Sequence, residues 1–184
     1  MDRYQAINLV KEKIANPNLI KHCLAVAAVM RGLAQHFSAD QDGWELAGLL
    51  HDIDYEQTKD DPLKHSLAGS EMLKELGLAD DICRAVLTHN EAHGIKPETL
   101  MEKSLFITDP LTGLIIAATL VLPSKKINEV TVENILNRYK EKGFARGANR
   151  EIIKQAETLL NLPMADFFRI GLQAMQQIAN DLGL

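Results

Sequence analysis

Residues 46–54, which read Leu46-Ala47-Gly48-Leu49-Leu50-His51-Asp52-Ile53-Asp54, decide the fold of this chain. An apolar run leads directly into a histidine and an aspartate, and a polar loop follows from Asp54 to Pro62. A short segment that is apolar on all sides indicates a buried helix. An imidazole and a carboxylate at the end of a buried helix are costly unless a partner satisfies them. The stretch therefore predicts a helical core that carries a polar site.

Helical spacing of apolar residues continues on both sides of this stretch. Residues 19–37 place Ile20, Cys23, Ala27 and Met30 along one stripe, and no alternating strand pattern of useful length occurs in the chain. Proline and glycine divide the pattern into segments. The predicted class is all-α. The helices are expected over residues 2–15, 19–37, 43–51, 62–77, 79–90, 97–122, 130–143, 148–160 and 164–182.

Two Asp-Pro pairs give specific expectations about helix ends. Asp61-Pro62 should start the fourth helix, with Asp61 as its N-cap and Pro62 at its first position. Asp109-Pro110 falls inside the sixth helical pattern. There the proline should kink the helix, or Asp109 should cap a new one.

The overall composition bounds the class of protein. The 184 residues are enough for one domain, and 46% hydrophobic with 24% charged residues is ordinary for a soluble globular protein. A net charge of −5 leaves no excess of cations to coat nucleic acid, although a small phosphorylated substrate needs only a local cluster. We therefore expect a single domain over residues 1–184 that does not coat nucleic acid.

The cysteines and the apolar segments indicate the cellular setting. Cys23 and Cys83 lie in apolar helical stretches, where small buried residues are found. The first residues lack the apolar core of a signal peptide, and the apolar run of residues 114–122 is too short to span a bilayer. We expect a cytoplasmic protein with no membrane partner.

Four further metal-capable residues lie on the inward faces of the expected helices, namely His22, His65, His89 and Asp109. Each has an ordinary explanation when it is taken alone. His22 could be a core histidine, and His65 could lie in an exposed first turn. His89 would suit a helix C-terminus, and Asp109 would suit a helix cap.

Taken with His51-Asp52, these residues would need five separate explanations on five helical segments. One metal cluster accounts for all of them, because bound ions satisfy buried imidazoles and carboxylates together. Such a ligand set suits Mn, Fe, Zn, Ni or Mg more than a metal that prefers thiolates. We therefore expect one or two divalent ions.

The order of His22, His51-Asp52 and Asp109 resembles the signature of the HD-domain phosphohydrolase superfamily. The resemblance covers roughly residues 19–122. It implies a helical core over those residues, with the C-terminal helices of residues 123–184 packing on it. It also implies an enzyme that hydrolyses a phosphomonoester or phosphodiester of a small substrate, such as a nucleotide, through a metal-activated water.

His65 and His89 are similar to the two further histidines of the dinuclear members of that superfamily. The resemblance implies that these two hold a second ion. The first ion would lie between His22, His51, Asp52 and Asp109, and the Asp52 carboxylate would bridge the two ions.

The segment after His51-Asp52 departs from the pattern of the superfamily. Many relatives read His-Asp-Ile-Gly followed by Lys, whereas this chain has Asp54 and Tyr55 at those two positions. A phosphate contact by that Lys therefore does not transfer to this chain. Lys59 and His93 are the candidates to supply a proton or positive charge to the leaving group. For His93 the alternative is a solvated loop histidine.

The C-terminal third offers weaker signals. Four basic residues could contact a substrate phosphate, and a solvated face is the alternative. The last helix has more apolar breadth than one face needs, which fits either the core or a homodimer contact. The four basic residues are Lys125, Lys126, Arg146 and Arg150.

Two other functions remain open at this stage. A di-iron oxygenase would use the same six ligands, and the acidic loop from Asp54 to Asp61 favours it slightly because it offers little to an anionic substrate. A non-catalytic binding or signalling module is the third possibility. The presence of all six candidate ligands argues against that module.

Overall fold

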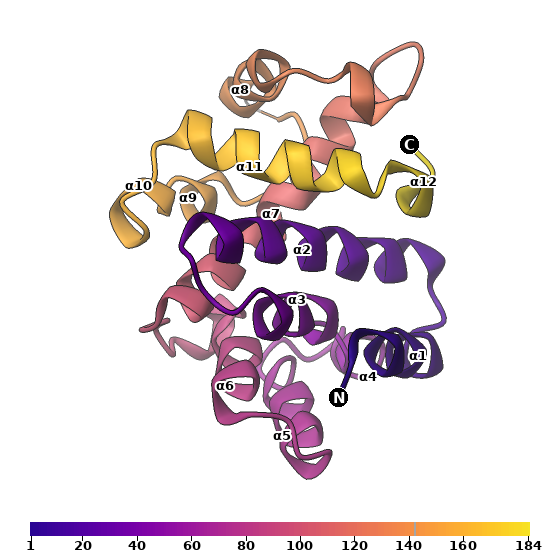
Figure 1. Ribbon diagram of the computed structural model, residues 1–184, viewed down its shortest axis with the longest axis vertical. Coiled ribbons are helices and arrows are strands. Elements are labelled where there is room, and N and C mark those ends of the chain that lie inside the picture. The colour runs from indigo at the N-terminus through magenta and orange to yellow at the C-terminus, as the bar shows by residue number, and fades with distance from the viewer. Residues whose placement is uncertain (142) are drawn as a thin grey trace.

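The computed structural model of the protein describes residues 1–141 and 143–184. These described residues form helices and no strand (Figure 1). The all-α prediction is confirmed. The helices are α1 (Arg3–Lys13), α2 (Pro17–His36), α3 (Gln41–Leu50), α4 (Tyr55–Thr58), α5 (Leu67–Glu75), α6 (Asp80–Thr88), α7 (Leu100–Leu120), α8 (Val132–Lys140), α9 (Arg150–Ile153), α10 (Ala156–Leu159), α11 (Met164–Gln177) and α12 (Ala179–Leu182), with short 3₁₀ turns η1 (Glu91–His93) and η2 (Ile127–Glu129).

Helix α2 is the central element. It crosses the middle of the molecule, with α11 along one side and α3 along the other (Figure 1). Asn16 caps its start with a side-chain oxygen that accepts from the Asn18 amide, and Pro17 takes the first helical position. Its apolar stripe is buried, from Cys23 to Ala34. His22 thus lies near the start of a helix with neighbours on several sides.

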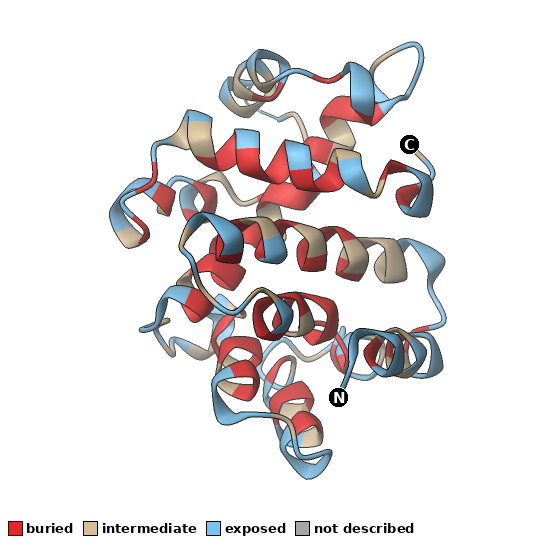
Figure 2. Cartoon of the chain, viewed as in Figure 1, coloured by how far each residue is buried: buried red, intermediate tan, exposed pale blue. Residues whose placement is uncertain are grey.

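Helix α3 is buried at seven of its ten residues and is mainly red in Figure 2. Gly48 allows its close approach to α2, since a Cβ added there would lie 2.9 Å from the Cα of Ala27. The chain turns directly after Leu50, and His51 and Asp52 occupy that turn. The apolar run therefore delivers the polar pair into the protein interior.

Helix α7 packs against α2, α6 and α11. It is long and apolar enough to cross a membrane by length and composition, but 61% of its most apolar window is buried inside the protein. Leu105, Leu111, Leu114 and Ile115 have no or almost no exposed surface. Its apolar side chains therefore contribute to the core of the protein.

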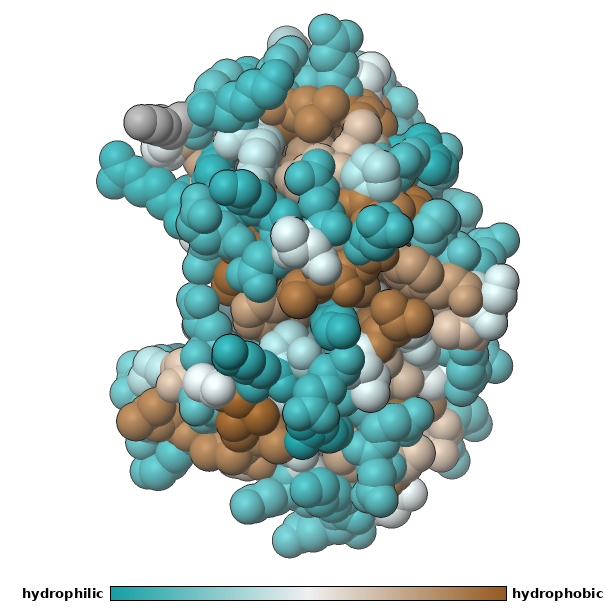
Figure 3. Space-filling view, turned by 90° about the vertical axis from the view of Figure 1, so that its left-hand side faces the viewer, coloured by the Kyte–Doolittle hydropathy of each residue, from teal (hydrophilic) through white to brown (hydrophobic). Residues whose placement is uncertain are grey.

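The C-terminal helices cover α2 and α7. Helix α11 packs on both, and its apolar residues Phe167, Phe168 and Met175 are fully buried within this chain. This burial accounts for the apolar breadth of the last helix, and the homodimer stays a prediction. The face in Figure 3 is mainly hydrophilic, with separated apolar groups and a hollow along one edge.

The expected fourth helix begins later than predicted. Asp61 and Pro62 lie outside any helix, and α5 starts only after Ser66, whose φ of 68° lies in the left-handed region. A serine at positive φ interrupts a helix. The interruption is stabilised because the Ser66 amide donates to Asp54 Oδ2 at 2.8 Å. The prediction that Asp61 caps a helix was wrong, because a long-range contact sets the backbone there.

The second Asp-Pro pair leaves its helix unbroken. Helix α7 continues through Pro110, and Asp109 is an interior helical residue instead of a cap. The Thr112 hydroxyl donates to the Asp109 carbonyl at 3.0 Å.

The C-terminal helices of the structure differ from the expected ones mainly in length. Residues 148–160 form α9 and α10, residues 164–182 form α11 and α12, and the expected helix over 130–143 ends at Lys140, with residue 142 outside the described residues.

Candidate metal centre

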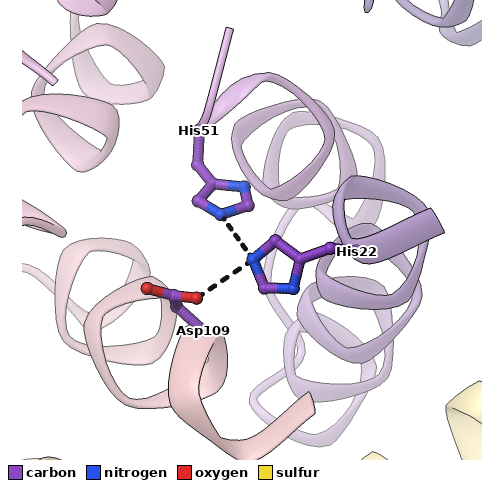
Figure 4. A group of neighbouring side chains, drawn as sticks. All are labelled: His22, His51 and Asp109. Atoms are coloured by element: carbon purple, nitrogen blue, oxygen red, sulfur yellow. Dashed lines mark hydrogen bonds and ion pairs between the residues drawn. The ribbon is translucent and has the colours of Figure 1, made fainter. Parts of the chain in front are cut away.

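Six polar residues from five segments meet in the interior between α2, α3, α6 and α7. His22 comes from α2, His51 and Asp52 follow α3, and His89 ends α6. His65 lies in the turn before α5, and Asp109 lies in α7. Figure 4 shows His22, His51 and Asp109 pointing toward one another from three separate elements. The structure thus brings together all the residues that the sequence singled out as metal ligands.

The first part of the cluster is built around His22. Its Nε2 lies 3.2 Å from His51 Nε2 and 3.1 Å from Asp109 Oδ1 (Figure 4). Asp52 Oδ2 lies 3.7 Å from His22 Nε2 and 3.4 Å from His51 Nε2. Donor atoms of His22, His51 and Asp109 all lie within 4.8 Å of one another. Four donor atoms therefore face one small region.

The second part lies on the other side of Asp52. Its Oδ1 lies 3.3 Å from His65 Nε2 and 3.5 Å from His89 Nε2, and these two nitrogens are 3.2 Å apart. The two oxygens of a single carboxylate therefore face two different groups of donors. This is the arrangement in which a carboxylate can bridge two ions.

The outer ring nitrogens show which inner nitrogens are free to bind. His51 Nδ1 lies 2.8 Å from the carbonyl of Gly48, and His89 Nδ1 lies 2.6 Å from the carbonyl of Val86. A carbonyl only accepts, so in the neutral rings the proton is assigned to Nδ1. Each Nε2 then carries a lone pair that points into the cluster. Metal-binding histidines commonly hold their outer N–H in this way.

The distances between the inner ring nitrogens show whether these residues fit a metal. His51 Nε2 faces His22 Nε2 at 3.2 Å, and His89 Nε2 faces His65 Nε2 at the same distance. Two imidazole lone pairs at that distance repel unless a proton or a cation lies between them. The ligand set of imidazoles and carboxylates therefore fits divalent cations, and no thiolate is among the ligands.

The electrostatics of the cluster favour charged carboxylates. Burial would raise the pKa of Asp52, but the neighbouring His51, His65 and His89 outweigh it and hold that pKa well below its usual range. Asp109 is partly exposed; desolvation would raise its pKa, but its hydrogen bond with His22 outweighs this and lowers the pKa. Both side chains are therefore ionised and available as ligands at neutral pH.

The histidines differ in their protonation. Burial lowers the pKa of His51 to about 4, so this ring is neutral at neutral pH. For His65, burial acts in the same direction, but hydrogen bonds to Asp52 and Asp54 outweigh it and raise the pKa to about 9. In the metal-free protein, His65 is therefore a cation that partly balances the carboxylates, and Asp109 and Asp52 also raise the pKa of His22 against the effect of its burial.

A cavity of about 440 Å³ opens onto the cluster. Its lining includes residues that the sequence did not single out: Tyr55, Phe106 and Ile152 provide apolar surface, and Asn90 and Asn149 provide amides. Asn149 Nδ2 donates to Glu91 Oε1 at 3.1 Å, so the turn before α9 and η1 meet beside the cavity. This contact joins two residues that are 58 positions apart in the sequence. No local sequence pattern could have indicated it.

His93 lies behind His65, not among the cavity-lining residues. Its Nε2 is 2.6 Å from the carbonyl oxygen of His65 and 2.9 Å from the Ser66 hydroxyl. These contacts support the backbone that carries His65. The geometry therefore favours a structural role for His93 over contact with a leaving group.

None of the five basic candidates is among the cavity-lining residues, although Arg146 directly precedes Gly147, which is one of them. Lys59 is exposed at the end of α4, and Arg146 is exposed before α9. Lys125 and Lys126 follow the far end of α7, whose last residue is roughly 16 Å along the helix axis from Asp109.

Arg150 has a structural environment. Its guanidinium donates to backbone carbonyls of the segment that surrounds it, including those of Tyr139 and Phe144 at 2.8 and 2.6 Å. Those donors are therefore occupied by the chain itself. The structure does not bring Arg150 to the metal cluster as a phosphate contact.

The fold and the cluster define a helical protein with a buried histidine–aspartate centre, and comparison with known families identifies the class. The model of the HD domain matches residues 19–114, which is more than half of the chain. The chain belongs to the HD-domain family. It thus has the type of site that metal-dependent phosphohydrolases use.

Curated relatives share this region. Ribonuclease Y of Lawsonia intracellularis is 29% identical over 138 residues, which cover 73% of this chain and 26% of the relative. An uncharacterised protein of Methanocaldococcus jannaschii, MJ0778, is 31% identical over 57% of this chain and 63% of its own length. A tRNA (cytidine(56)-2'-O)-methyltransferase of Picrophilus torridus is 32% identical over 59% of this chain and 31% of its own length. The chain thus spans about a quarter of ribonuclease Y.

Proposed function

We propose that this protein is a phosphohydrolase that uses two divalent ions. His22, His51, Asp52 and Asp109 would hold one ion, and His65 and His89 would hold the other, with Asp52 shared. The observation that carries this proposal is the position of the Asp52 carboxylate, whose Oδ2 faces His22 and His51 while its Oδ1 faces His65 and His89.

When bound, a pair of ions supplies an activated water and positive charge for the phosphoryl oxygens. The residues of the chain contribute orientation. Gly48 and Val86 fix the rings of His51 and His89 through their carbonyls, so the ligands hold their directions before substrate arrives. Phe106 and Ile152 give the cavity an apolar wall, which limits the access of bulk water to the reacting group.

We propose a small phosphomonoester or phosphodiester as the substrate, with nucleotides first among the candidates. The cavity of about 440 Å³ is of the size that holds a small molecule. Its apolar surface, to which Tyr55, Phe106 and Ile152 contribute, suits a planar base. The printed names of two relatives, a ribonuclease and a tRNA methyltransferase, also concern nucleic acid.

Among the described residues that line the cavity, none is a lysine or an arginine. The charge of the phosphate would therefore be matched by the ions themselves, which favours a substrate with one phosphate group. We also place the protein in the cytoplasm, which is supported by its free buried cysteines, Cys23 and Cys83.

Elemental analysis of the purified protein, together with a hydrolysis screen, tests the proposal. The screen should include p-nitrophenyl phosphate, bis-p-nitrophenyl phosphate and nucleoside monophosphates. Asp52→Ala should abolish hydrolysis and leave the helical circular dichroism signal intact. Asp60→Ala, which changes an exposed aspartate in the same loop, is the matched control. Wild-type turnover by Asp52→Ala would remove Asp52 from the mechanism.

A di-iron oxygenase is the second candidate, and the lack of cationic side chains among the described cavity-lining residues favours it. The same six ligands would serve. An iron chromophore with substrate-dependent dioxygen uptake, in a preparation that hydrolyses no phosphate ester, would support the oxygenase and reject the hydrolase.

A further inference from the structure

Asp54 is a fully buried carboxylate just outside the metal cluster. Its Oδ2 accepts from the Ser66 amide at 2.8 Å, and its Oδ1 lies 3.2 Å from His65 Nδ1. Oδ1 has no hydrogen bond to any other described residue. A buried carboxylate oxygen with no other partner is unfavourable, so the contact with His65 is the one that balances its charge.

This contact distinguishes His65 from the other three histidines of the metal cluster. The outer nitrogens of His51 and His89 face neutral carbonyls, and that of His22 lies 3.2 Å from the Thr112 hydroxyl. The outer nitrogen of His65 alone faces a carboxylate. A carboxylate acceptor fixes the proton on Nδ1 and makes the inner Nε2 a stronger electron donor.

Other residues are arranged around this contact. Gly69 leaves the space that the carboxylate occupies, since an added Cβ would lie 2.9 Å from Asp54 Oδ1. Ser66 keeps its left-handed φ of 68° while its amide bonds to Asp54 and its hydroxyl donates to the Leu87 carbonyl at 2.9 Å. A strained residue persists only where its surroundings hold it. The backbone next to His65 is thus fixed from two directions.

We propose that Asp54 is a positioning residue that holds His65 as a ligand and thereby sets the affinity of the ion shared by His65 and His89. The proposal rests on the two-ion function proposed above. It gives a specific role to the residue that replaces the glycine found in many relatives.

The substitution Asp54→Asn isolates this role. An asparagine has nearly the same shape but only one oxygen, while the Ser66 amide and the His65 Nδ1–H are both donors. If the oxygen accepts from Ser66, the amide NH₂ faces His65 and favours a proton on Nε2 instead of Nδ1. That proton occupies the nitrogen that would bind the ion. The loss should therefore be confined to the ion on the His65 side.

The test is a titration of the metal-free protein with Mn²⁺, in which the EPR signal of free Mn²⁺ gives the number of ions bound and the affinity of each. The wild type should bind two ions. Asp54→Asn should bind one ion as the wild type does and the other about 10- to 100-fold more weakly. Asp60→Asn makes the same chemical change at an exposed position of the same loop and should match the wild type.

A second variant guards against a general loss of structure. Gly69→Ala leaves every polar group in place but pushes on Asp54 Oδ1, and it should weaken the same ion. The helical circular dichroism signal should be retained in both Asp54→Asn and Gly69→Ala.

The outcomes separate the two proposals. If Asp54→Asn binds both ions with wild-type affinity, the positioning role is wrong while the two-ion hydrolase stands. If the wild type binds two ions and Asp54→Asn loses one, but no phosphate ester is hydrolysed, the positioning role stands and the hydrolase is wrong. A wild type that binds only one ion would overturn both.

Discussion

The close contact between α2 and α3 depends on Gly48. The substitution Gly48→Ala tests whether this contact tolerates a Cβ at that position. The new Cβ would lie 2.9 Å from both the Cα and the backbone nitrogen of Ala27 and 3.0 Å from Met30 Cγ. Carbon atoms pack at about 3.5–4.0 Å, so the two helices must separate by roughly 0.6–1 Å. Because two of these contacts are with backbone, no side-chain rotation relieves them.

The expected magnitude combines two opposing effects. Overpacking of this kind costs about 1–3 kcal/mol, and the better helix propensity of alanine returns up to about 1 kcal/mol. We expect a net loss of about 1–2 kcal/mol, which in a protein of this size lowers the Tm by roughly 2–8 °C. The shift of α3 should also widen the gap of 3.2 Å between His22 and His51 and weaken metal binding there.

Thermal denaturation of the metal-free protein measures the first effect. Gly113→Ala is the matched control, because Gly113 is exposed in the middle of α7 with nothing within 4 Å of the added Cβ. That variant should gain about 1 kcal/mol from helix propensity and melt roughly 2–4 °C higher than the wild type. A Tm of Gly48→Ala at or above the wild-type value would refute the assignment of Gly48 as the closest point between the helices.

Two further predictions concern the histidines. The double variant His65→Ala with His89→Ala should bind one ion instead of two and hydrolyse phosphate esters far more slowly, as judged by metal stoichiometry beside rate; if both stay unchanged, the centre is mononuclear. In the metal-free protein, the pKa of His51 is lowered by burial to about 4 from 6.5, so its contribution to stability is present above pH 6.5 and is lost as the pH falls. The free energy of unfolding in urea should therefore drop by about 3 kcal/mol between pH 6.5 and pH 4, and a drop of the same size in His51→Gln would contradict this origin.

Most of the clustered residues could be predicted because they lie on or next to the inward side of a helix, whereas His65 lies in the turn before α5. Apolar spacing fixes which face of a helix is buried, and a histidine or aspartate on that face must then enter the interior. For His22 and His89 the helices end within two residues of the expected limits. The sequence was therefore sufficient wherever local periodicity determined the direction of a side chain.

The errors arose where contacts distant in the sequence determine the structure. The delayed start of α5 depends on Ser66 donating to Asp54, a bond that spans 12 residues and that no helix-start signal reveals. Arg150 looked available for a phosphate, because charge patterns contain no information about backbone carbonyls. Asn149 and Glu91 meet beside the cavity only after the C-terminal segment has folded onto α7.

The distribution of the cluster over the chain has a consequence for folding. The side chains of α2 and α7 that meet there are 90 residues apart at the contact of His22 with Thr112, and the chain has no disulfide, because Cys23 and Cys83 are free. Ions held by the proposed ligands would act as reversible cross-links between helices, in addition to packing and to polar contacts such as that of His22 with Asp109. Binding to the folded state alone adds about 2.7 kcal/mol when the free ion is at 100 times its Kd. The metal supply of the cell would then control how much of this protein is folded, as well as whether it is active.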